Sequence, residues 1–177
     1  MHRLLWLPAI LLVTALAGCN SMRIDDYAET RPALDLFEYF EGKTRAWGMF
    51  QGRDGTLKRR FTVDIAGRVE GDRLTLTEDF VYDDGEVQQR IWRIQRTGEG
   101  RYIGTADDVV GDALGEASGS AFHWRYVLRL PYGEGTVDVS FDDWMFLQPG
   151  GVLLNRAKMK KFGFTLGEVT LAFVKEQ

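Results

Sequence analysis

Two adjacent carboxylates, Asp142 and Asp143, stand within the bulky apolar segment FDDWMF at positions 141–146. A pair of carboxylates can supply the acid and the base of a hydrolytic reaction. The flanking aromatic residues predict a β-strand, however, and successive side chains of a strand point to opposite faces. Asp143 then shares the apolar face with Phe141 and Met145, whereas Asp142 points outward. The two carboxylates therefore cannot act together on one bond.

Other catalytic and metal-binding patterns are weak. The chain has 2 histidines, and His2 lies in a leader-like N-terminal segment, which leaves His123 alone in the body of the protein. A single histidine cannot form a multi-histidine zinc site. A Ser-His-Asp unit is not indicated, because none of the serines lies in a nucleophile-elbow motif. The sequence predicts no catalytic residue, no metal and no cofactor, although an enzyme that uses inward carboxylates remains an alternative.

A second polar group is predicted inside the fold. In the segment 73–82, Glu78 shares one face with apolar residues. If residues 83–85 form a three-residue turn with Gly85 in the left-handed conformation, Glu78 lies opposite Arg90. This register pairs an acid with a base and apolar residues with one another. We predict an inward Glu78–Arg90 ion pair, which either fixes the register or contacts a ligand.

The same alternation gives further inward positions. Asn155 shares a face with apolar neighbours, and the segment 121–130 carries an aromatic stripe on one face. Apolar walls with a few polar groups are the usual form of a small-molecule site. The candidates for a ligand-binding lumen are Glu78, Arg90, Trp92, Trp124, Tyr126, Asp143 and Asn155. The alternative is that these side chains only fill a packed core.

Short runs rich in β-branched and aromatic residues, separated by turns with Gly and Asp, must position these side chains. The predicted strands are 43–52, 57–68, 73–82, 86–97, 100–107, 121–130, 135–147, 151–158 and 165–175. The span 108–120 is predicted as a loop, and Pro32 as the start of a short helix capped by Thr30. Tight turns favour an antiparallel meander, which closes most readily into a barrel. The predicted fold is therefore all-β, an up-and-down lipocalin-like barrel of about 8–10 strands with a short N-terminal helical segment.

The amino-acid composition indicates which classes of protein this chain can belong to. The 177 residues are 45% hydrophobic and 27% charged, which is typical of one globular domain. The formal net charge of -4 gives no basic surface for nucleic acid. With 1 cysteine, the chain has no intramolecular disulfide.

The N-terminal stretch MHRLLWLPAILLVTALAGCN is typical of an export signal. Its apolar run is too short for a comfortable membrane span and ends in small residues. We predict a lipoprotein signal peptide over 1–18, a tether over 19–32 and the β-barrel domain over 33–177. The ending LAGC resembles a lipobox, which implies lipidation of Cys19, palmitate included, and stable anchoring by several acyl chains. Asn20 stands where Asp would favour inner-membrane retention, so we expect the periplasmic face of the outer membrane.

Four further motifs are spread over the rest of the chain: AWGMFQGRDG, LTEDFVYDDGE, DDVVGDALG and FDDWMFLQPGGVLLNRAKMKKFGFTLGEVTL. With them the chain resembles a family of uncharacterised Gram-negative lipoproteins, domain of unknown function 3833. The resemblance implies a lipid-anchored, single β-barrel domain and supplies no activity. The architecture is also similar to that of lipocalins, with Trp47 in the place of their barrel-base tryptophan. Arg45 stands where the lipocalin pattern has glycine.

We therefore expect an outer-membrane-anchored lipoprotein whose barrel binds or carries a hydrophobic or amphiphilic, lipid-like small molecule. One alternative is an envelope module with a packed barrel that binds a protein partner, and the other is the enzyme above. The expected contacts are the membrane, through the lipid anchor, and a lipid or small hydrophobic ligand. No nucleic acid is expected, and the sequence identifies no protein partner.

Overall fold

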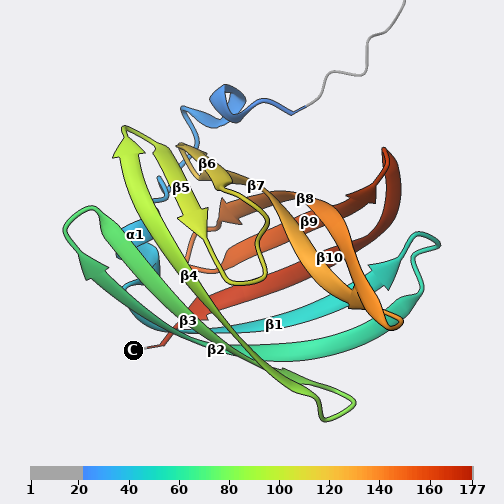
Figure 1. Cartoon of the computed structure of the whole chain (residues 1–177). Helices are drawn as coiled ribbons and strands as arrows, with labels where there is room; N and C mark the ends of the chain where they lie inside the picture. Colours follow the sequence, from blue (N-terminus) through green and yellow to red (C-terminus); the bar gives the residue numbers. More distant parts are fainter. Residues whose placement is uncertain (1–21, 177) are drawn as a thin grey trace, which may run out of the picture.

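A computed structural model of the chain describes residues 22–176 and shows a closed antiparallel barrel (Figure 1). Its strands are β1 (Gly42–Gly52), β2 (Leu57–Glu70), β3 (Arg73–Tyr82), β4 (Val87–Gly98), β5 (Arg101–Thr105), β6 (Ala113–Ser118), β7 (Ala121–Tyr132), β8 (Gly135–Leu147), β9 (Leu153–Lys161) and β10 (Phe164–Lys175). Each strand pairs with its neighbours in sequence, and β1 pairs with β10 to close the ring. The predicted all-β, up-and-down barrel is confirmed.

Alternation of side chains builds the core, as expected for strands with one wet face. On β2, Val63 and Ile65 are buried while Asp64 is exposed and pairs with Arg45 on β1. Within residues 22–176, no helix is long and apolar enough to cross a membrane.

One strand was not predicted. β6 lies inside the span 108–120, which the sequence pattern predicts as a loop. Its alternate residues Ala113, Gly115 and Ala117 are small. At Gly115 the reason is Trp124, because a Cβ there would overlap the Trp124 ring. Packing against this large side chain therefore requires residues with low strand propensity. The segment then lacks the β-branched and aromatic residues by which a strand is recognised in sequence.

The short helix begins later than predicted. α1 spans Leu36–Phe40, and the Asp35 carboxylate caps it by accepting hydrogen bonds from the first-turn amides. The expectation that Pro32 begins the helix and that Thr30 caps it is wrong. Thr30 instead donates to the Tyr27 carbonyl and contacts Ser120 on the turn between β6 and β7.

Helix α1 closes one end of the barrel. Its apolar side chains, including Leu36 and Phe40, are buried in the main core. Gly67 on β2 allows this close approach, because a Cβ there would overlap the Phe40 carbonyl. Figure 1 shows α1 at the left end of the barrel, away from the β1–β2, β7–β8 and β9–β10 turns.

Two aromatic residues on the outer face have different surroundings. Trp144 is buried because Tyr27, at the end of the 3-10 helix η1 (Ile24–Tyr27), packs over it and over Phe146. Trp47 is 50% exposed on the outside of β1. The expected similarity of Trp47 to a lipocalin barrel-base tryptophan is therefore wrong.

Candidate functional site

The barrel is hollow. A cavity of about 360 Å³ occupies its lumen, with mostly apolar walls. Leu36 and Phe40 of α1 form its floor, while Arg59 and Tyr82 line it nearer the turns of the opposite end. This volume lies near the lower end of the range for small-molecule sites, about 300–1,000 Å³.

All seven predicted lumen residues lie on the wall of this cavity: Glu78, Arg90, Trp92, Trp124, Tyr126, Asp143 and Asn155. They come from β3, β4, β7, β8 and β9, so the closed sheet is needed to bring them together. That they contact a ligand remains a prediction.

The β3–β4 hairpin has the predicted register. Gly85 has a φ of 85°, and the Tyr82 amide donates to the Glu86 carbonyl at 2.9 Å across the turn. Glu78 consequently lies opposite Arg90. Correct turn chemistry thus places both charged side chains inside the barrel.

The predicted direct ion pair between them is wrong. Arg90 binds Asp108 instead, with Nε at 3.1 and 3.0 Å from the two carboxylate oxygens and Nη2 at 2.7 Å from one of them. Among the residues described, no ion-pair contact joins Glu78 to Arg90. Asp108 was missed because it belongs to a loop whose position depends on β7, a contact that local sequence does not reveal.

This loop completes the barrel wall between β4 and β7. Backbone pairing of β4 with β5 begins at Arg93, so the preceding part of β4 faces loop residues 106–112 (Figure 1). The loop is joined to β7, since the Arg129 amide donates to the Asp108 carbonyl at 2.8 Å. The Arg90–Asp108 pair therefore links β4 to the loop where the ladder of backbone hydrogen bonds is interrupted.

A buried polar cluster surrounds Asp143, which is only 5% exposed. Asn155 Nδ2 and the Tyr126 hydroxyl both donate to its carboxylate, the latter at 3.3 Å. Burial nevertheless raises the pKa of Asp143 to about 7, against the lowering effect of these hydrogen bonds. Asp143 and Asn155, each predicted to face the lumen, are therefore in direct contact.

Glu78 is the second perturbed carboxyl group. Burial raises the pKa of Glu78 to about 7, although the positive charge of Arg90 lowers it. The side chain remains partly accessible because it lines the cavity. Two carboxyl groups with pKa values near neutrality thus share one apolar lumen.

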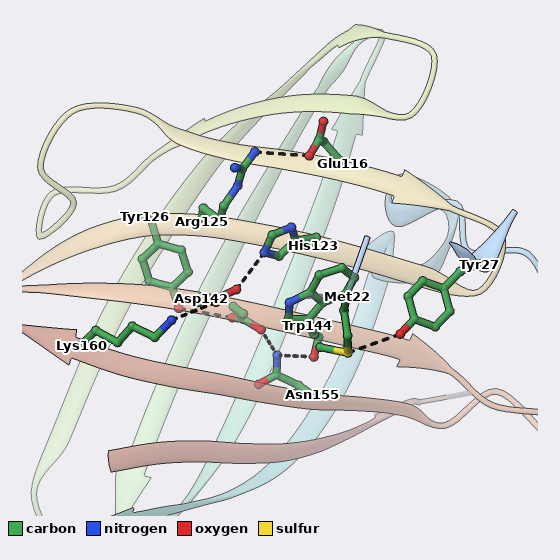
Figure 2. Close-up of polar contacts among 11 residues, drawn as sticks. Met22, Tyr27, Glu116, His123, Arg125, Tyr126, Asp142, Trp144, Asn155 and Lys160 are labelled. Atoms are coloured by element: carbon green, nitrogen blue, oxygen red, sulfur yellow. Dashed lines mark hydrogen bonds and ion pairs between the residues drawn. The ribbon is translucent and has the colours of Figure 1, made fainter. Parts of the chain in front are cut away.

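Asp142 lies on the opposite face of the same strand, as predicted. It binds His123 Nε2 at 2.8 Å and Lys160 Nζ at 3.3 Å, and the imidazole of His123 stacks on Trp144 (Figure 2). Partial burial raises the pKa of Asp142, but the hydrogen bonds from His123 and Lys160 outweigh burial and lower it overall. Asp142 is therefore an ionised surface group.

Comparisons with known proteins agree with this architecture. A family model described as "Protein of unknown function (DUF3833)" matches residues 13–175. The crystal structure of Rv2717c from M. tuberculosis is similar, with a TM-score of 0.58, 13% identity, and coverage of 84% of this chain and 100% of that one. At this identity the likeness shows the fold alone. No curated protein matches the chain.

Proposed function

The chain belongs to the DUF3833 family, and we propose that its barrel binds or carries a hydrophobic or amphiphilic small molecule. The observation that carries this proposal is the cavity of about 360 Å³, with apolar walls and a few polar groups. Such a space suits an apolar ligand with one polar end. A solidly packed interaction module, the alternative from the sequence, would fill this space.

The proposal places the barrel at the outer membrane, on its periplasmic side. It rests on the lipobox-like sequence before Cys19, a residue outside the described range. Acyl chains on Cys19 would hold the barrel at a source of amphiphiles. A mass for the N-terminal peptide that lacks residues 1–18 and carries acyl groups would support the anchor, and an unmodified N-terminus would contradict it.

Native mass spectrometry of the purified protein tests ligand binding. We expect a co-purifying small molecule that is lost in Ala157→Phe, because Ala157 is 2% exposed and lines the cavity. Ala66→Phe is the matched control, since Ala66 is exposed on the outer face of β2. A cooperative thermal unfolding transition in each variant would show that both variants fold.

The result that contradicts the proposal is a cavity without a ligand. If no molecule co-purifies and no member of a lipid library raises the melting temperature of the wild type, the carrier function fails. Retention of the ligand by folded Ala157→Phe would place binding elsewhere on the molecule.

A second candidate function is acid–base catalysis in the lumen. It is favoured by the raised pKa of Asp143 and of Glu78, since catalytic carboxyl groups are tuned towards neutral pH. Any co-purifying ligand can be incubated with wild type and with Asp143→Asn. Chemical change in the wild type alone would favour an enzyme, and an unchanged mass in both would favour a binding protein.

A further inference from the structure

The polar cluster of the lumen contains an acceptor without a donor. Asn155 is 3% exposed, and its Nδ2 faces two acceptors, the Asp143 carboxylate and the Trp144 carbonyl at 3.4 Å. The Trp144 carbonyl can only accept, so the amide nitrogen faces it and the amide oxygen points away. Within the described chain, Asn155 Oδ1 is buried and has no hydrogen-bond partner. Leaving a buried acceptor without a donor is unfavourable, so this atom favours a ligand that supplies one.

The hydroxyl and the ionic groups nearest Asn155 accept hydrogen bonds or already donate to another residue. The Tyr126 hydroxyl donates to Asp143, and Arg90 is held by both oxygens of Asp108. A second carboxyl group, Glu78, faces the same space. A further donor, Arg59, lines the cavity near the β3–β4 turn, where Nη2 binds Asp84 and Glu86 and Nε is unpartnered. The Asp143 end of the lumen is therefore rich in acceptors.

We propose that the polar group of the ligand is a hydrogen-bond donor, an amine in preference to a hydroxyl, seated between Asn155 Oδ1 and Asp143. This inference rests on the proposed ligand-binding function and specifies its ligand class. An ammonium group would donate to the unpartnered acceptor and neutralise a carboxylate. A free carboxylate there would face the Asn155 amide oxygen and, at and above neutral pH, the negative charge of Asp143, while Nε and Nη2 of Arg90 already bind Asp108.

An amine ligand should differ from a neutral ligand in how its affinity depends on pH. Burial raises the pKa of Asp143 and of Glu78 to about 7, so both carboxyl groups are largely protonated below neutrality. An alkylamine stays charged over this range, as a lysine side chain does. Its binding favours the ionised carboxylate, so its affinity should rise as the pH rises through about 7. A neutral alcohol should show no such rise.

Titration calorimetry with decylamine, 1-decanol and decanoate tests the proposal on the wild-type protein at about pH 6 and about pH 8. We expect decylamine to bind most tightly and to gain affinity at the higher pH. Asn155→Leu should weaken decylamine binding by about tenfold, the usual effect of losing a hydrogen bond to a charged group. Asp143→Asn should reduce the pH dependence to the part that Glu78 contributes.

The matched control is Asp138→Asn, on the outer face of the same strand, where Asp138 binds Arg129. It should leave all three affinities unchanged. Decanoate binding as tightly as decylamine would overturn the donor preference and leave the ligand-binding function intact. If none of the three compounds binds, the proposed function fails and the inference with it. The comparison of decylamine with decanoate on the wild-type protein tests the donor preference even where a variant does not fold.

Discussion

At the scale of the residue, neighbouring aspartates have opposite properties. Asp142 faces outward, where hydrogen bonds from His123 and Lys160 outweigh partial burial and lower its pKa. Asp143 faces inward, and burial raises its pKa to about 7. One residue of displacement along a strand thus turns a surface carboxylate into a proton-binding group of the lumen. Local sequence reveals this difference only when the parity of the strand is known.

The first prediction concerns the pH dependence of stability. The pKa of Glu78 and that of Asp143 are about 7 in the folded state, against ordinary values near 4 in the unfolded chain. The folded state therefore holds more protons between about pH 4 and about pH 7, so stability falls as the pH rises through this window and remains lower above it. Glu78→Gln and Asp143→Asn should flatten this fall, as measured by melting temperature.

Asp79→Asn is the control for these variants, because Asp79 lies exposed on the outer face of β3 and accepts a hydrogen bond from Gln89. It should keep the wild-type profile. Paired surface carboxylates such as Asp138 have a lowered pKa, so they lose their contribution only at more acidic pH. A wild-type melting temperature that rises from about pH 5 to about pH 8 would contradict the prediction.

At the scale of the element, local turn chemistry was predictable and long-range packing was not. Gly85 marks the turn that sets Glu78 opposite Arg90, and that register is confirmed. β6 escaped prediction because Gly115 is small to accommodate Trp124, a residue of the adjoining strand β7. The ionic partner of Arg90 could not be predicted for the same reason, since Asp108 contacts Arg90 from a loop that is joined to β7.

The second prediction concerns the contact of α1 with β2. Gly67→Ala should destabilise the fold by at least about 1–3 kcal/mol, the usual cost of overpacking, because a Cβ would overlap the Phe40 carbonyl. Urea unfolding measures the change. Gly98→Ala is the control, since the nearest atom to its Cβ would be Arg101 Nε at 3.7 Å. Equal effects of the two substitutions would show that α1 is not held by this close approach.

At the scale of the whole molecule, apolar side chains mark one end of the barrel. Tyr132 at the β7–β8 turn is 76% exposed, and Phe162 and Phe164 at the β9–β10 turn are 86% and 71% exposed. Lys161 lies with its Nζ 4.7 Å from the centre of the Phe162 ring. Figure 1 places both turns at the end of the barrel opposite α1, so these aromatic and basic groups gather at that end.

The third prediction is that this end contacts lipid. Aromatic rings and lysines are favourable at a membrane interface. In flotation with phosphatidylcholine–phosphatidylglycerol vesicles, the unlipidated protein should bind, and Phe162→Ser with Phe164→Ser should reduce the bound fraction several-fold. Leu114→Ser is the control, because Leu114 is 48% exposed on β6. Equal loss in the control would indicate general hydrophobic adsorption.

Closure of the ring by β1 and β10 has a consequence for folding order. Every other strand pair joins neighbours along the chain and can form as a hairpin, whereas Ala46 must find Phe173. Contacts so distant in sequence are slow to form, because closing the loop costs conformational entropy before the new contacts stabilise the chain. Until this seam is made, the first and last strands both present open edges to other chains. The final strand thus determines when a newly made chain stops presenting open strand edges to other copies.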